Sequence, residues 1–356
     1  MRKSEKPLKL LLRQRIYFLF EALVIFLGIF IFMLIPTFLL PFLINIQSVF
    51  FEPLYYLLRA LILIAAIPLF LYLANFLMEK QRKKLILEED ISPSRKFLNL
   101  FRITKKNYKF QLLYGVLLLF LIFIPLDFFT YLFSPEMLSW SAIALDPAGE
   151  FSLNSYFNQN YYIFLFSIII IPLMVAIYEE SLVRGFLSNR GSDYVNSMSA
   201  VIITSFFFGL LHFDIVFLRP SLGLPIIFPI IWFLQTFFVG IILAMVVLRK
   251  HWIFPVIFAH TLNNVISSLA IWNYLNGQDF SLMAIFVYSP LLIVAIILIV
   301  WQFSRIKESL SIGFKQFKSY FKRDKDIEQR SLDTIVRIIL DFLIGFIIFL
   351  IGVVIL

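Results

Sequence analysis

Long apolar runs separated by short polar segments make up most of the chain. A membrane-spanning helix needs roughly 20 mostly apolar residues, because the hydrocarbon core of a bilayer is about 30 Å thick. Runs of about this length occur at residues 16–35, 54–78, 112–133, 162–187, 198–213, 224–248, 253–272, 282–301 and 336–356. The pattern therefore predicts an all-α fold, a polytopic membrane helix bundle with about eight or nine transmembrane helices. No small-residue cleavage site follows the first run, so we expect an uncleaved anchor rather than a signal peptide.

Lys and Arg are distributed unevenly between the segments that connect these runs. If the N-terminus is cytoplasmic, the basic residues concentrate in the inner segments 1–15, 80–109 and 304–335, whereas the outer loops hold only Arg219. Cytoplasmic loops of membrane proteins carry an excess of Lys and Arg, so we predict a cytoplasmic N-terminus. The net charge of +9 follows from this membrane pattern. We therefore expect membrane lipids, and no nucleic acid, as partners.

The basic segment 304–335 also has an apolar side. Leu310, Phe314, Phe317 and Phe321 recur at helical spacing, while the lysines between them fall mainly on other faces. This pattern predicts an amphipathic helix that lies on anionic lipid. A solvated linker is the alternative, and the sequence leaves it open.

Composition agrees with a membrane protein and narrows its chemistry. Hydrophobic residues make up 61% of the chain and charged residues 15%, unlike the mixture of an ordinary soluble domain. The chain contains no cysteine. Disulfides, thiolate metal sites and a cysteine nucleophile are therefore excluded.

The stretch "YEESLVRGFL" places charge at the end of the apolar run 162–187. Charged residues inside membrane spans are costly, so those that occur usually face the protein interior or a wet cavity. Glu179 and Glu180 lie about 100° apart around a helix and must face different surroundings. Glu180 and Arg184 have the i, i+4 spacing of an intrahelical ion pair. Glu179 is left to face another group.

Two of the three histidines fall within apolar runs. His212 ends "FGLLH", and His260 begins "HTLNN", where Asn264 shares its helical face and Asn263 does not. A carboxylate, two imidazoles and an amide on three helices can activate water and stabilise an oxyanion. We expect Glu179 and His212 to do the first and His260 and Asn264 the second, in hydrolysis of an acyl bond.

Each of these features also has a purely structural interpretation. The Glu180–Arg184 spacing alone explains that pair, His212 could pack against its aromatic neighbours, and His260 with Asn264 could join helices. Phe208, one turn before His212, is expected to orient the histidine ring. The other charges near predicted membrane ends are assigned to snorkelling, capping or a local pair: Glu21, Arg59, Asp127, and Asp341 with Arg337.

The motifs "EESLVR", "FGLLH" and "HTLNN" resemble, in this order, EExxxR, FxxxH and HxxxN of the CPBP family. This family comprises CAAX proteases and bacteriocin-processing enzymes, also called Abi proteins, and includes the type II CAAX prenyl endopeptidases. The resemblance spans about residues 162–270. It implies a catalytic membrane core at 111–303, with the motifs within 178–264. Around it we predict a two-helix region with a basic loop at 1–110, the amphipathic segment 304–335 and a C-terminal transmembrane helix at 336–356.

The resemblance implies an intramembrane endopeptidase with a cavity that opens towards the cytoplasm. It implies that Glu179 and His212 activate water, that His260 and Asn264 bind the oxyanion, and that Glu180 and Arg184 support the helix. No cofactor is expected under this glutamate mechanism. A zinc ion bound by Glu179, His212 and His260 is the alternative, but Asn264 is a better oxyanion donor than zinc ligand.

Two other functions compete with peptidase activity. The chain could be a proteolytically inactive scaffold or bacteriocin-immunity protein that regulates a membrane partner, or it could be a transporter, although no internal repeat supports the last. The Phe-, Ile- and Lys-rich composition favours a multi-pass protein of a bacterial plasma membrane. The expected substrate is a membrane-associated peptide or protein.

Overall fold

The computed structural model describes residues 7–82, 86, 91–145, 153–213, 220–323 and 330–355. These residues form helices joined by short connections, and no strand occurs among them. Eight of the described helical segments are long and apolar enough to cross a membrane. The predicted all-α membrane bundle is therefore confirmed.

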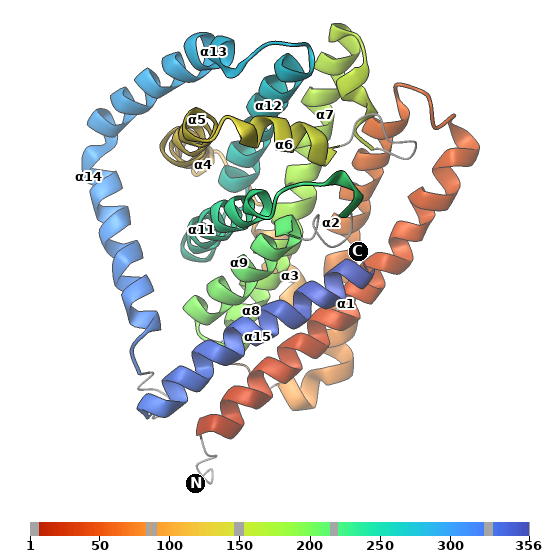
Figure 1. The fold of residues 1–356 in the computed structure, drawn as a ribbon. Coiled ribbons are helices and arrows are strands. Elements are labelled where there is room, and N and C mark those ends of the chain that lie inside the picture. The colour runs from red at the N-terminus through yellow and green to blue at the C-terminus, as the bar shows by residue number, and fades with distance from the viewer. Residues whose placement is uncertain are drawn as a thin grey trace, which may run out of the picture.

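The elements follow one another along the chain with few long connections (Figure 1). In chain order they are α1 (Pro7–Leu43), α2 (Phe51–Arg82), α3 (Pro93–Asn99), α4 (Tyr108–Leu118), η1 (Leu119–Phe123), α5 (Ile124–Phe133), α6 (Glu136–Leu145), η2 (Ser155–Asn158), α7 (Tyr161–Glu180), η3 (Ser181–Ser188), α8 (Asn189–Tyr194), α9 (Ser197–Phe213), η4 (Pro220–Leu222), α11 (Ile227–Lys250), α12 (Phe254–Leu275), α13 (Phe280–Met283), η5 (Ala284–Tyr288), α14 (Ser289–Tyr320) and α15 (Ser331–Ile355).

Helix α9 is the exception among the predicted spans. It corresponds to the run 198–213 but has only 17 residues, too few to be counted with the eight long helices. It packs against α11 and α15, and most of its side chains are buried. A short helix can be tolerated here because protein, rather than lipid, surrounds it.

Helices α1 and α15 lie side by side along one edge of the bundle (Figure 1). Between them, the buried Arg15 guanidinium donates to Asp341 Oδ1 from Nε at 2.8 Å and from Nη2 at 2.5 Å. The predicted local pairing of Asp341 with Arg337 is therefore wrong. Arg337 Nη2 instead donates to the backbone carbonyls of Tyr320 and Lys322.

Glu21 of α1 is also buried. Its carboxylate accepts hydrogen bonds from Arg190 Nε at 2.7 Å and Nη2 at 3.1 Å, and from the Tyr194 hydroxyl. This network ties α1 to α8. Arg59 likewise does not snorkel, because its guanidinium lies 4.1 Å from the centre of the Tyr178 ring.

The basic amphipathic segment is a continuation of α14 and not a separate element. The helix bends at Gln302, whose φ of −107° and ψ of 16° are not helical, and then runs on to Tyr320. Leu310, Phe314 and Phe321 are exposed, as predicted, whereas Phe317 is partly buried against a cluster formed by α9, α11 and Tyr320. Helix α15 begins at Ser331, five residues before the predicted start of the last span.

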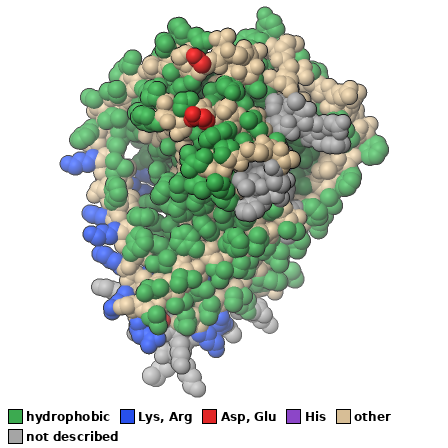
Figure 2. Space-filling model, in the orientation of Figure 1, with side chains coloured by type: hydrophobic (Ala, Val, Ile, Leu, Met, Phe, Trp, Pro, Cys, Tyr) green, Lys and Arg blue, Asp and Glu red, His purple; other side chains and the backbone are tan. Residues whose placement is uncertain are grey.

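Charged side chains are unevenly distributed on the face of the molecule seen in Figure 2. On the face seen in Figure 2, Lys and Arg gather in the lower half, near the N-terminus, and Asp and Glu appear near the top. This distribution agrees with the predicted cytoplasmic N-terminus, which remains a prediction.

Candidate active site

All four predicted catalytic residues line one cavity of about 370 Å³. Glu179 comes from the end of α7, His212 from the end of α9, and His260 and Asn264 from the first half of α12. Glu180 and Phe208 line the same cavity. Residues that lie far apart in the sequence are therefore brought together where three helices meet.

The helix that carries the two carboxylates changes its winding directly after them. Helix α7 ends at Glu180 and continues as the π-helical segment Ser181–Ser188, in which every residue is buried. The side chain of Glu180 is fully buried, whereas that of Glu179 is 27% exposed. Their different surroundings confirm the prediction made from their 100° separation.

Glu180 bonds to two side chains, Arg184 and His260, rather than to Arg184 alone. Its Oε1 accepts a hydrogen bond from Arg184 Nη1 at 3.0 Å, which confirms the predicted ion pair, and another from His260 Nδ1 at 2.8 Å. The Arg184 guanidinium lies 4.1 Å from the centre of the Phe208 ring. Glu180 therefore does more than support its own helix, because it also orients the histidine of α12.

The bond to Glu180 fixes how His260 faces the cavity. Because a carboxylate accepts, the proton of this bond belongs to Nδ1 of the ring. The other nitrogen, Nε2, lies 3.7 Å from Glu179 Oε2, and the ring stacks on Phe123 with a centroid distance of 6.2 Å. Nε2 is therefore the atom that His260 presents beside Glu179.

His212 is held by the preceding turn of its own helix. Its Nδ1 lies 2.9 Å from the Phe208 carbonyl oxygen, which can only accept, so the proton is on Nδ1. In the neutral ring, Nε2 then has a free lone pair. The rings of Phe208 and Trp232 meet His212 edge to face, at 4.8 and 5.3 Å. Phe208 thus orients His212 with its carbonyl as well as with its ring.

Two consecutive amides of α12 reach the cavity. Asn264 was expected there, and Asn263 lines the cavity as well, although helical spacing alone separated it from His260. Asn263 Oδ1 is buried and has no hydrogen-bond partner among the described residues. The cavity is wide enough to include both side chains, which sequence spacing could not reveal.

The cavity extends beyond the four predicted residues to a second polar group. Asp127 Oδ2 accepts a hydrogen bond of 2.6 Å from Ser267, and Gln235 bonds to Thr130. All four of these side chains line the cavity. Asp127 is therefore not a residue that caps or snorkels at a membrane end. The neighbouring residues in the sequence did not indicate that Asp127 lines the cavity, because several helices together form the cavity wall.

The described lining runs from Glu179 and His260 towards α6, which lies on the side away from the N-terminus (Figure 1). On the other side of Glu180, the buried residues of η3 fill the bundle. In the predicted orientation, the cavity lining thus extends towards the outer side of the membrane. The family resemblance instead implies a cavity that opens towards the cytoplasm.

The residues do not form the set that a zinc ion would need. Among the described ranges, no group of three His, Cys, Asp or Glu side chains lies close enough together to hold a metal. A catalytic zinc has three protein ligands at about 2 Å. As arranged, Glu179, His212 and His260 do not fit it.

Comparison with known families finds one match. Residues 161–266 match a family described as type II CAAX prenyl endopeptidase Rce1-like. The matched segment begins with α7 and ends within α12, so it contains Glu179, His212, His260 and Asn264. No curated protein and no solved structure matches the chain.

Proposed function

We propose that this chain, whose residues 161–266 match the type II CAAX prenyl endopeptidase Rce1-like family, is a glutamate-dependent intramembrane endopeptidase. Its substrate is a membrane-associated peptide or protein, and its location is the plasma membrane of a bacterium. The observation that carries the proposal is the convergence of Glu179, His212, His260 and Asn264 on one cavity.

In the proposed reaction a water molecule is bound between Glu179 and Nε2 of His212. Glu179 accepts a proton as the water oxygen attacks the carbonyl carbon of the scissile bond. Glu179 suits this task because its side chain is 27% exposed and faces the cavity, whereas Glu180 is committed to Arg184 and His260. His212 suits the task of holding the water, because its Nδ1 proton is used by the Phe208 carbonyl.

The oxyanion of the tetrahedral intermediate requires hydrogen-bond donors. His260 can donate from Nε2 only when it is doubly protonated, because Nδ1 already donates to Glu180. A protonated His260 would help Arg184 to balance the negative charges of Glu179 and Glu180. The amide of Asn264 is the second donor. When the carbon–nitrogen bond breaks, the proton held by Glu179 passes to the leaving amine.

The proposal is tested with purified protein in lipid vesicles and a peptide mixture, with products followed by mass spectrometry. Removal of a general base costs about 10²- to 10⁴-fold in rate, so Glu179→Gln should lose cleavage by this factor. His212→Ala should also lose most of its activity. Glu308→Gln, an exposed change on α14, removes a carboxylate far from the cavity and should cleave like the wild type.

The same assay separates the peptidase from an inactive scaffold. Cleavage by both Glu179→Gln and His212→Ala at the wild-type rate would contradict the glutamate mechanism. If cells with either substituted protein show the same phenotype as cells with the wild type, this result would favour the scaffold.

A further inference from the structure

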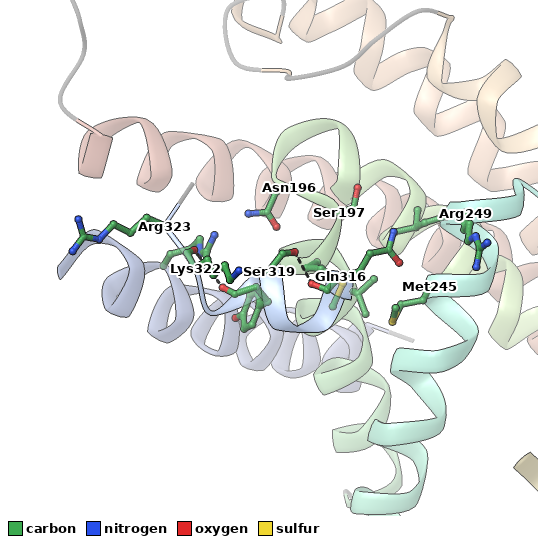
Figure 3. Close-up of a pocket in the computed structure, with 13 residues that line it drawn as sticks. Asn196, Ser197, Met245, Arg249, Gln316, Ser319, Lys322 and Arg323 are labelled. Carbon is green, nitrogen blue, oxygen red and sulfur yellow. Dashed lines mark hydrogen bonds between the residues drawn. The ribbon is translucent and has the colours of Figure 1, made fainter. Parts of the chain in front are cut away.

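A second cavity, of about 410 Å³, lies outside the candidate active site and shares no lining residue with it. Its walls come from the start of α9, the end of α11, the end of α14 and the start of α15 (Figure 3). In the predicted orientation these helix ends lie at the cytoplasmic side of the membrane. The proposed peptidase mechanism makes no use of this cavity.

The lining of this second cavity is basic. Arg249, Lys322, Arg323 and Arg337 contribute to it, and none of the described residues in the wall is acidic. Arg249 and Lys322 have no ion-pair partner within the described ranges. Two described carboxylates of α15 already have partners: Asp333 accepts from the Arg330 backbone N–H and Nε, and Asp341 accepts from Arg15 and from the Tyr320 hydroxyl. The positive charges of Arg249 and Lys322 are therefore available to an external anion.

Neutral polar groups stand opposite one another across the cavity. In Figure 3, Asn196 and Ser197 lie on one side, and Gln316 and Ser319 lie on the other. Helix α9 begins here, with Asn196 Oδ1 accepting from the Ser199 backbone N–H at 2.8 Å. The N-terminus of a 17-residue helix adds a partial positive charge to that of the basic side chains. Such a combination suits an oxyanion with several acceptor oxygens.

The basic end of α14 is fixed against α15 before any ligand arrives. Arg337 donates to the carbonyl oxygens of Tyr320 and Lys322, and Arg323 donates to Ser331 Oγ at 2.5 Å. These bonds fix the backbone segment that carries Lys322 and Arg323. Binding therefore requires little ordering of the backbone, which favours affinity.

The remaining wall is apolar, formed by Met198, Val201, Met245 and Leu248. Basic pockets between transmembrane helices at the cytoplasmic side are suited to phosphorylated lipid headgroups. We propose that this cavity binds the phosphate group of an anionic phospholipid headgroup or of a soluble phosphate ester. The apolar wall would contact the carbon skeleton that carries the phosphate.

The test compares two double variants of the purified full chain. Arg249→Gln with Lys322→Gln removes two cations from the cavity wall, and Lys315→Gln with Lys318→Gln removes two exposed cations of α14 outside it. Phosphatidylcholine vesicles with and without phosphatidylglycerol test the lipid, and glycerol 3-phosphate and inorganic phosphate in detergent test soluble ligands. A single thermal transition at the wild-type temperature checks that each variant is folded.

A basic residue near an anionic membrane surface changes affinity about fivefold. The α14 variant should lose up to about 25-fold in vesicle binding, because this part of α14 is predicted to lie on anionic lipid. The cavity variant should in addition lose saturable binding of phosphatidylglycerol and of the soluble phosphates, which the α14 variant should keep. Saturable binding of glycerol 3-phosphate that the cavity variant loses, with no preference for vesicles that contain phosphatidylglycerol, would identify a soluble phosphate ester as the source. Saturable binding that both variants keep or that both lose, or no phosphate-dependent binding of any probe, would overturn the proposal.

Discussion

At the residue scale, the most informative side chain is the carboxylate of Glu180. One of its oxygens serves both Arg184 and His260, so a single buried group connects α7 and η3 with α12. Its neighbour Glu179 makes a longer contact with the same histidine, with its Oε2 at 3.7 Å from His260 Nε2. We therefore expect the two adjacent acids to have separate consequences, Glu180 for stability and Glu179 for the proposed chemistry.

We expect Glu180→Gln and Glu179→Gln to differ in stability. Removal of one partner from a buried ion pair costs about 3–5 kcal/mol, because the other charge stays buried without compensation. Glu180→Gln should thus unfold at a clearly lower temperature than the wild type in detergent, whereas Glu179→Gln should unfold near the wild-type temperature. A Glu180→Gln protein as stable as the wild type would show that Arg184 finds another partner.

At the element scale, α1 and α15 are held together by charge as well as by apolar packing. Arg15 and Asp341 are both buried and are joined by two hydrogen bonds of 2.8 and 2.5 Å. Both helices lie outside the segment that matches the protease family. They pack on each other, and α15 also packs on α9, which carries His212. The terminal helices therefore support the site from outside it.

A double-mutant comparison can measure this contact between helices. Asp341→Asn should destabilise the protein by about 3–5 kcal/mol, because it leaves the Arg15 guanidinium buried beside a neutral amide. Arg15→Met combined with Asp341→Leu should recover at least half of this loss, since neither charge remains. Unfolding in detergent checks both variants, with Glu308→Gln as the surface control. A double variant less stable than Asp341→Asn would contradict this account.

At the scale of the whole molecule, two cavities have different chemistry. One is lined by Glu179, Glu180 and Asp127, with no Lys or Arg among its described lining residues. The other is lined by four cationic side chains near the ends of α11, α14 and α15. The bundle thus combines the cavity of the candidate active site with a second cavity that we propose binds phosphate groups.

Metal removal tests whether the candidate active site depends on a zinc ion. Because the three residues of the zinc alternative do not gather into a metal-binding group within the described ranges, we expect activity to survive exhaustive chelation. Activity and metal content of the same purified sample should be measured before and after chelation. Loss of cleavage that zinc restores, with one zinc bound per chain, would reverse this expectation.

Much of the architecture was predictable from local properties of the sequence. Apolar runs indicated the long helices, because the thickness of a membrane sets the length of a span. The spacing of Glu180 and Arg184 predicted their pair, since both residues lie on one helix. The motifs alone indicated Glu179, His212, His260 and Asn264 as the candidate catalytic set, because polar groups stand out in apolar helices.

Contacts between distant segments could be decided only by tertiary structure. Arg15 and Asp341 are 326 residues apart, and Glu180 and His260 are 80 apart. Local spacing instead suggested Arg337 as the partner of Asp341 and a position at the membrane end for Asp127. Sequence periodicity determines which residues share a face of one helix. Which face meets which neighbour depends on the rotation and packing of all the helices together, and that brought Glu180 to His260 and Asp127 into the cavity.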